Sequence, residues 1–250
     1  MTHTLISLRR EGAVCIVQLE RPDKLNALSG ALERELRSAL GEPELATSGA
    51  VVLTGSGRAF SAGADISEFS DRDPEAILAY YRETGGVYEA IAALAQPTFS
   101  AIHGYCLGGG LELALATDFR IADQTAVFGF PEVGLGILPS SGGTHRVARL
   151  LGAARAKELI LLRDRLTADE ALAAGLVTEV VAAGGAVGRA VELARKVAAL
   201  PATAVAVTKS AIDAAADAPR DAAVLIERLA YGLLAQTDAA RKAADDFTGR

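Results

Sequence analysis

Hydrophobic and polar residues alternate near the start of the chain, over residues 4–9 and 13–19, with a Glu-Gly pair between the two segments. A period of two is typical of half-buried strands, so these segments predict a β-hairpin. Apolar residues recur with helical spacing over residues 25–40 and 74–94. Short apolar runs predict further strands at residues 49–54, 98–102, 119–122 and 126–128. The first part of the chain is therefore predicted to alternate strands with helices, an α/β pattern.

The pattern changes after about residue 142, where helical spacing dominates. In this last part of the chain only residues 176–181 have the pattern of a strand. Periodicity does not distinguish a doubly wound sheet from other arrangements of such strand–turn–helix units. The predicted helices cover residues 143–151, 153–162, 168–174, 187–200, 202–216 and 222–235.

Composition and charge restrict the class of protein. Of the 250 residues, 50% are hydrophobic and 22% are charged, which is the balance of a globular chain. The net charge of −6 gives no general attraction to nucleic acid or to acidic membrane surfaces. Cys15 and Cys106 have no CxxC or zinc spacing and are expected to be buried, reduced thiols. The N-terminus lacks a signal-peptide pattern, and no apolar run reaches the roughly 18 residues that span a bilayer. We therefore expect a cytoplasmic protein.

Two motifs rich in small residues carry the candidate chemistry. Residues 59–66 read Ala-Phe-Ser-Ala-Gly-Ala-Asp-Ile, and residues 103–113 read His-Gly-Tyr-Cys-Leu-Gly-Gly-Gly-Leu-Glu-Leu. Each motif predicts a turn that follows a strand and directs backbone N–H groups into a gap, and the second turn opens a helix. Taken singly, the first motif also fits an ordinary turn, and the glycines of the second also fit close backbone packing. Together they supply two N–H donors to one oxygen, which is what the stabilisation of an enolate requires.

Two glutamates accompany these motifs, Glu112 in the first turn of the predicted helix and Glu132 after Pro131. Two carboxylates in one desolvated site divide acid and base roles, because burial and mutual repulsion separate their pKa values. Singly, the first also fits a helix N-terminus and the second an ordinary loop. With residues 128–136, which read Phe-Gly-Phe-Pro-Glu-Val-Gly-Leu-Gly, the three segments resemble the crotonase (enoyl-CoA hydratase/isomerase) superfamily. The resemblance covers nearly the whole chain.

The resemblance implies an α/β fold, a crotonase-like spiral of repeated ββα units with a C-terminal helical region used in trimerisation. Residues 1–195 would form the spiral core, and residues 196–250 would pack on the core or on a neighbouring subunit. A homotrimer or a dimer of trimers is expected. The substrate would be an acyl-CoA thioester, with no cofactor, no metal, and no nucleic-acid or membrane partner.

The resemblance also implies roles for individual residues. The N–H groups of Ala64 and Gly109 would form the oxyanion hole. Glu132 would be the acid/base at the α-carbon, and Glu112 would orient and activate the water. The candidate contacts with coenzyme A are Lys24 for a phosphate and Ala62, Asp65 and Ile66 for the adenine and pantetheine channel.

The leading hypothesis is an enoyl-CoA hydratase, which adds water reversibly and syn to a trans-2-enoyl-CoA. A Δ3,Δ2-enoyl-CoA isomerase needs only one carboxylate, and Glu112 argues against it. Hydratase–lyase chemistry on aromatic enoyl-CoA substrates is a second rival. A rival from another class is an RNA-binding hydratase-like protein, which the acidic composition disfavours.

Some segments depart from the family pattern or leave their role open. Ser67 stands where many hydratases have a lysine near the nucleotide, and residues 237–250 lack the family's usual C-terminal sequence. Both departures concern how coenzyme A is held. Ser140 and Ser141 precede a predicted helix, where capping is the expected use of their hydroxyls. Candidates for the acyl pocket are residues 128–137 and the aromatic residues Phe69, Tyr80, Tyr81 and Tyr88.

Overall fold

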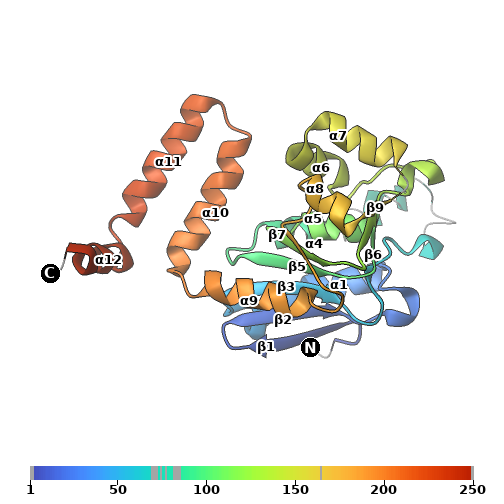
Figure 1. Cartoon of the computed structure of the whole chain (residues 1–250), viewed down its shortest axis with the longest axis horizontal. Helices are drawn as coiled ribbons and strands as arrows, with labels where there is room; N and C mark the ends of the chain where they lie inside the picture. The colour runs from blue at the N-terminus through green and yellow to red at the C-terminus, as the bar shows by residue number, and fades with distance from the viewer. Residues whose placement is uncertain are drawn as a thin grey trace.

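The computed structural model describes residues 3–68, 73, 75–76, 78–80, 86–163 and 165–248. Its described strands form a six-stranded sheet of order β1-β2-β3-β5-β7-β10 and a four-stranded sheet of order β4-β6-β8-β9 (Figure 1). The strands of the larger sheet are β1 (Ile6–Glu11), β2 (Val14–Leu19), β3 (Ala50–Gly55), β5 (Thr98–Ile102), β7 (Phe119–Asp123) and β10 (Glu179–Val181). Those of the smaller sheet are β4 (Ala59–Ser61), β6 (Tyr105–Leu107), β8 (Val127–Gly129) and β9 (Leu166–Thr167).

From β3 to β8, successive strands alternate between the two sheets. β3, β5 and β7 lie side by side and parallel in the larger sheet. The strand that follows each of them, β4, β6 or β8, lies in the smaller sheet, where these three are also parallel. The helices α4, α5 and α6 then return the chain to the next repeat. This is the spiral of ββα units that was expected, and the mixed α/β prediction is confirmed.

Helices cover the sheets and continue beyond them (Figure 1). The N-terminal half contains α1 (Gly30–Ala39), α2 (Pro43–Ala46), α4 (Gly86–Ala92) and α5 (Gly109–Leu115). The C-terminal half contains α6 (Gly143–Leu151), α7 (Ala153–Lys157), α8 (Ala168–Ala173), α9 (Ala186–Ala198), α10 (Ala202–Ala216), α11 (Arg220–Leu234) and α12 (Asp238–Thr248). Single helical turns are η1 (Pro22–Lys24), η2 (Ile66–Glu68), η3 (Glu132–Leu135) and the π-helical η4 (Glu158–Leu162).

The central strands β2, β3 and β5 of the larger sheet are buried on both faces, which explains their nearly continuous apolar sequences. One face packs against α9, where Val52 and Phe99 meet Ala190 and Ala194 in one apolar cluster. The opposite face belongs to a second cluster with the small sheet and the helices α1, α4 and α5. Because α5 is buried along its whole length, it is closely packed, and movements of its neighbours are transmitted to it.

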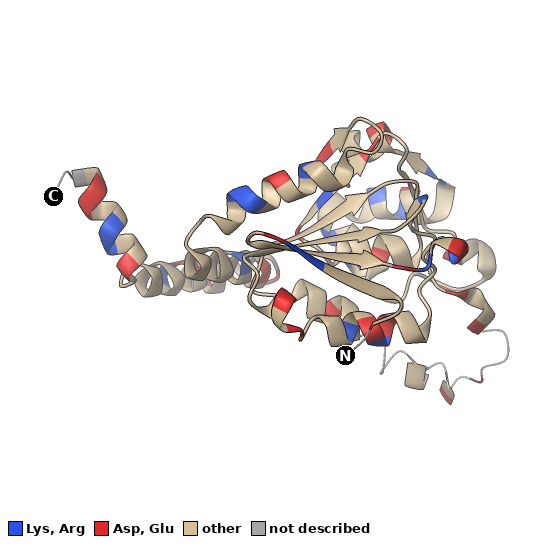
Figure 2. Cartoon of the chain, turned by 90° about the horizontal axis from the view of Figure 1, so that it is seen from below, with Lys and Arg blue, Asp and Glu red and all other residues tan. Residues whose placement is uncertain are grey.

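The last helices extend away from the sheets, as both Figure 1 and Figure 2 show. Neither α10 nor α11 contains a buried residue. The boundary expected after residue 195 falls within α9, and the division of the chain at that point stays a prediction. In Figure 2, Lys and Arg positions are interspersed with Asp and Glu positions along the ribbon. Among the described helices, none is long and apolar enough to cross a membrane.

Several elements differ from the sequence prediction. The helix predicted from residue 25 begins only at Gly30, after the N-cap Ser29, because Leu25 and Asn26 adopt left-handed φ angles of 50° and 54°. The buried Asn26 side chain fixes this turn through hydrogen bonds to three backbone groups. The strands β4, β6 and β9 and the helix α12 were not predicted. Much of the helix predicted over residues 74–94 lies outside the described residues.

Candidate active site

The two small-residue turns meet at one place between the sheets. After β4, Ala64 forms a parallel bridge with Leu28, in which Leu28 N–H donates to Gly63 O and Asp65 N–H donates to Leu28 O, each over 2.8 Å. This pairing leaves the N–H of Ala64 on the other side of the strand. Gly109 is the first residue of α5, where backbone N–H groups have no partner within the helix. In the described part of the chain, neither N–H makes a hydrogen bond.

The glycines of these turns allow the close approach. A methyl group on Gly109 would lie 3.4 Å from Ala64 N, and one on Gly63 would lie 3.5 Å from Gly109 N. Gly63 has φ of +104° and Gly108 has φ of +49°, values that L side chains rarely adopt. Two free backbone donors therefore face a common space, next to the positive end of α5. This is the arrangement in which a developing oxyanion is stabilised.

Glu112, in the first turn of α5, is 3% exposed and is held by the loop that precedes α6. Its Oε1 accepts hydrogen bonds from Ser141 N–H (2.6 Å) and Gly143 N–H (2.8 Å). Burial raises the pKa of Glu112, while these two donors and the charge of Arg146 oppose the rise. In the described part of the chain, its Oε2 makes no hydrogen bond, so this oxygen is left to bind a small ligand such as water.

Glu132 lies on η3 beside the turn over residues 107–109, which opens α5. A methyl group on Gly108 would lie only 2.6 Å from Glu132 Oε1, which measures how closely this carboxyl approaches the turn. Its Oε2 is buried and has no hydrogen-bond partner among the described residues. Burial, together with the charge of Glu112, raises the pKa of Glu132 to about 7 against the opposing effect of its own backbone N–H. The two glutamates therefore share one site and influence each other's protonation.

The predicted capping role of Ser140 and Ser141 is wrong for α6. The N-cap of this helix is Gly142, at φ of 106°, and no side chain caps it. Glycine is needed in the adjacent position as well, since a methyl group on Gly143 would lie 2.9 Å from Glu112 Oε1. The loop thus presents backbone N–H groups to Glu112 instead of serine hydroxyls.

The candidate coenzyme A residues lie in or next to the turn over residues 62–64. Ala62 N–H donates to Leu25 O (2.9 Å), which joins this turn to η1 and its exposed Lys24. Ile66 is 65% exposed, and Ala62 is half-buried. Asp65, half-buried, already accepts from Ser67 Oγ (2.6 Å) and Arg21 (3.0 Å), and these bonds lower its pKa.

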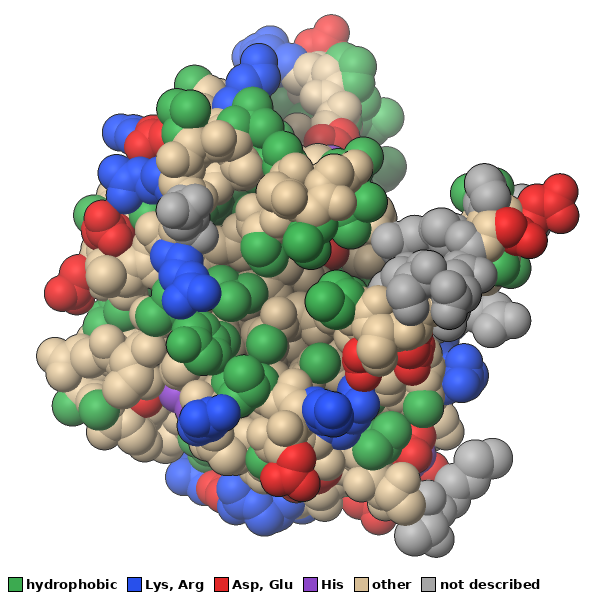
Figure 3. Space-filling model, turned by 90° about the vertical axis from the view of Figure 1, so that its right-hand side faces the viewer, with side chains coloured by type: hydrophobic (Ala, Val, Ile, Leu, Met, Phe, Trp, Pro, Cys, Tyr) green, Lys and Arg blue, Asp and Glu red, His purple; other side chains and the backbone are tan. Residues whose placement is uncertain are grey.

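Exposed apolar side chains surround this region. They belong to η2, η3 and the loop that follows, and Figure 3 shows hydrophobic side chains around a hollow on this side of the molecule. The exposed residues are Ile66, Val133, Leu135, Ile137 and Leu138. An apolar rim suits an acyl chain or a pantetheine arm.

Sequence reasoning missed Glu33, which is 4% exposed and lies behind Gly109. Its two carboxylate oxygens accept hydrogen bonds from the hydroxyls of Tyr80 and Tyr88, each over 2.7 Å. Tyr88 Oη lies 3.6 Å from the position of a methyl group on Gly109, and burial with the charge of Glu33 raises the pKa of Tyr88 well above its ordinary value. The helical position of Glu33 on the buried face of α1 was the available signal. The pocket candidates Phe69 and Tyr81 lie outside the described residues.

Among the described residues, no group of three or more His, Cys, Asp or Glu side chains is placed to hold a metal ion. Both cysteines are buried free thiols, as expected, and burial raises the pKa of each.

Several known proteins are similar to this chain over nearly its whole length. A 2,3-dehydroadipyl-CoA hydratase of Escherichia coli is 35% identical over the full length of both chains. The short-chain-enoyl-CoA hydratase of Clostridium acetobutylicum is 38% identical over 97% of this chain and 94% of its own. The crystal structure of an enoyl-CoA hydratase from Bacillus anthracis superposes with a TM-score of 0.92 at 36% identity, covering 98% of this chain and 96% of the other. The enoyl-CoA hydratase/isomerase family matches residues 9–250, and the chain belongs to that family.

Proposed function

We propose that the protein is an enoyl-CoA hydratase, which adds water reversibly and syn to a trans-2-enoyl-CoA thioester. The observation that carries the proposal is the convergence of two unbonded backbone N–H groups with two glutamates of raised pKa. The names of the similar proteins support the same reaction class.

In the proposed mechanism, the thioester oxygen accepts hydrogen bonds from Ala64 N–H and Gly109 N–H, so that negative charge gathers there as the reaction proceeds. Glu112 Oε2 holds the water, while Oε1 stays fixed by the loop before α6. The water loses a proton to Glu112 and its oxygen bonds to the β-carbon. Glu132 gives its proton to the α-carbon, which completes the addition with no change in the number of protons.

The binding roles of Lys24, Ala62, Asp65 and Ile66 are part of the proposal. Asp65 would bind coenzyme A together with Arg21, because the two side chains form an ion pair over 3.0 Å. No cofactor is proposed, since the acid and base groups of the site suffice for hydration. A cytoplasmic location stays a prediction.

We also propose a homotrimer or a dimer of trimers. The apolar side chains left exposed on α10, α11 and α12 support it, among them Ile212, Leu225, Leu229 and Phe247. Sedimentation of the purified protein tests this, and a stable monomer at micromolar concentration would contradict it.

The direct test of the activity is the loss of enoyl absorbance with crotonyl-CoA, beside a longer-chain and an aromatic enoyl-CoA. Turnover of any of them, reduced to a small residual rate in Glu132→Gln and Glu112→Gln and kept in the exposed control Glu192→Gln, is the expected result. If the folded protein hydrates none of the three substrates but isomerises a 3-enoyl-CoA, the protein is an isomerase and the proposal is wrong. RNA binding with submicromolar affinity and a steep salt dependence would replace it by the binding class.

A further inference from the structure

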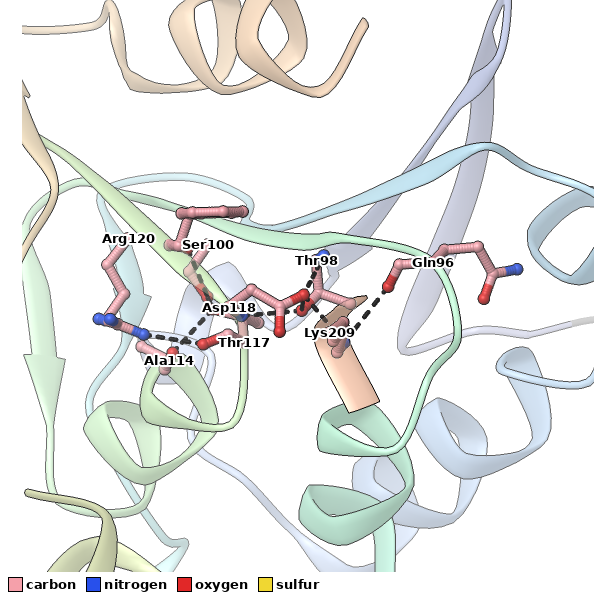
Figure 4. Close-up of polar contacts among 9 residues, drawn as sticks. Gln96, Thr98, Ser100, Ala114, Thr117, Asp118, Arg120 and Lys209 are labelled. Atoms are coloured by element: carbon pink, nitrogen blue, oxygen red, sulfur yellow. Dashed lines mark hydrogen bonds and ion pairs between the residues drawn. The ribbon is translucent and has the colours of Figure 1, made fainter. Parts of the chain in front are cut away.

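One ion pair joins the projecting helix α10 to the body of the protein. Lys209 Nζ lies 2.9 Å from Asp118 Oδ2 and 3.3 Å from Gln96 O (Figure 4). The two side chains are only 12% and 23% exposed. Such a pair is screened less by solvent than an exposed pair and holds its geometry better.

Asp118 is itself fixed to the larger sheet. Its Oδ2 also accepts from Thr98 N–H (2.7 Å) and Thr98 Oγ1 (2.8 Å). In return, Asp118 N–H donates to Thr98 Oγ1 over 2.9 Å. The contact with Lys209 therefore ties α10 to the starts of β5 and β7 rather than to a mobile side chain.

The same cluster holds the C-terminal end of α5 (Figure 4). Thr117 Oγ1 donates to Ala114 O in the last turn of this helix, and Arg120 Nη1 donates to Thr117 O, each over 2.8 Å. Arg120 thus places a cation beside the negative end of the helix, which is favourable. Since α5 is a short, fully buried rod, the position of this end determines that of Gly109 and Glu112 at the other.

A second contact joins α10 to α6. Arg149, in the last turn of α6, donates from Nη2 to Asp213 O (2.7 Å) and pairs through Nη1 with Asp217 (2.9 Å). Gly143, at the other end of α6, donates to Glu112. The helix that carries Glu112 and the helix that orients it are therefore both tied to α10 at the ends opposite the site.

We propose that Lys209 and Arg149 are positioning residues for Glu112, and that α10 is a strap that sets the spacing of α5 and α6. The proposal rests on the proposed hydratase function. Loss of the Lys209 contact lets α5 shift against α6, so the hydrogen bonds of Glu112 Oε1 lose alignment. Misplacement of a reacting group by about 1 Å costs up to about 100-fold in rate.

The test compares Lys209→Met, Lys209→Arg and Arg149→Met with Arg189→Met. The last variant removes a partly buried ion pair of α9 with Glu179 that touches neither α5 nor α6. We expect Lys209→Met to lower kcat by about 10- to 100-fold with KM within twofold. Arg149→Met, which removes a more exposed pair, lowers kcat by up to about fivefold. Lys209→Arg restores most of kcat, and Arg189→Met leaves it unchanged.

The decisive measurement repeats Lys209→Met in a Glu112→Gln background. A residue that acts through Glu112 has no further effect there, whereas a general loss of structure lowers the residual rate by the same factor. Equal losses in both backgrounds, or a folded Lys209→Met enzyme with kcat within twofold of wild type, would overturn the proposal. If Lys209→Met does not fold, Arg149→Met in both backgrounds decides in the same way.

Hydrogen exchange separates this proposal from the proposed function. Amides of residues 107–116 should exchange faster in Lys209→Met than in Arg189→Met, whatever reaction the enzyme catalyses. If the exchange of these amides is unchanged in Lys209→Met, the proposal that α10 positions α5 is wrong. If exchange is faster but the protein hydrates none of the enoyl-CoA substrates, the positioning role of α10 is supported and the hydratase function is contradicted.

Discussion

Replacing Gly108 with alanine tests whether the turn over residues 107–109 and Glu132 form one site. Gly108 adopts φ of 49° and ψ of −126°, a conformation that is essentially restricted to glycine. The new methyl group would lie 2.6 Å from Glu132 Oε1 and 3.3 Å from its Cδ. Since real methyl groups do not approach an oxygen this closely, the carboxyl or the turn must move.

Two effects of different kind are expected from Gly108→Ala. The backbone conformation costs about 1–3 kcal/mol of stability. For a chain of this size, each kcal/mol lowers Tm by about 2–4 °C. Displacement of Glu132 removes a positioned acid, whose contribution to rate is typically about 10²- to 10⁴-fold. We therefore expect kcat with crotonyl-CoA to fall by at least about 100-fold in a protein that still folds.

Gly12→Ala is the matched control, because it isolates the backbone cost. Gly12 has φ of +64°, and a methyl group there would meet no atom within 4 Å. Its left-handed φ costs about 1–2 kcal/mol, and the hairpin is remote from both glutamates. The assay is the loss of enoyl absorbance beside thermal unfolding by circular dichroism. A folded Gly108→Ala enzyme with kcat within about threefold of Gly12→Ala would refute the reasoning.

Three further predictions follow from the same contacts. First, kcat/KM for hydration should fall as pH rises through about 7, the raised pKa of Glu132, because the reactive enzyme carries one proton on its pair of glutamates. The reverse reaction should fall over the same range, since hydration consumes no proton and its equilibrium is independent of pH; a flat profile between pH 6 and 9 contradicts this. Second, a carboxyl whose pKa is raised on folding stabilises the protein below its unfolded pKa, and that contribution is lost as pH rises to about 7. The Tm of Glu132→Gln relative to that of wild type should therefore increase from pH 5 to pH 8. A Tm difference that stays constant over this range would contradict the raised pKa of Glu132. Third, Asn26→Ala removes three hydrogen bonds between a buried side chain and backbone atoms and should cost about 3 kcal/mol. Urea unfolding measures this loss, and a loss under about 1 kcal/mol would show that the left-handed turn does not depend on the side chain.

The sequence predicted those elements whose apolar pattern is long or sharply ended. The helices α6 and α10 have the predicted bounds, and β5 has them as well. By contrast, β4, β6 and β9 contain only two or three residues each, too few for a period of two to be recognised. The start of α1 was misplaced because a side chain, Asn26, holds the backbone in a left-handed turn that no periodicity reveals.

The backbone part of the site was more predictable than its side-chain environment. Small residues are required where Ala64 and Gly109 approach each other, so the local runs of small residues predicted both turns, and the family resemblance pointed to these two residues. The partners of Glu112 could not be derived, because Ser141 and Gly143 bind it through backbone N–H groups that any residue carries. The cluster of Glu33 with Tyr80 and Tyr88 depends on contacts between distant segments, which only the fold brings together.

The unequal surroundings of the two glutamates favour a division of roles. The two backbone donors on Glu112 Oε1 stabilise the charged carboxylate against the cost of its burial. Glu132 has a buried oxygen without a partner, which favours its protonated form and raises its pKa to about 7. With one proton between them, that proton therefore resides mainly on Glu132, and Glu112 carries the charge. This is the state that hydration requires, because the water must lose a proton to one carboxyl while the α-carbon receives a proton from the other.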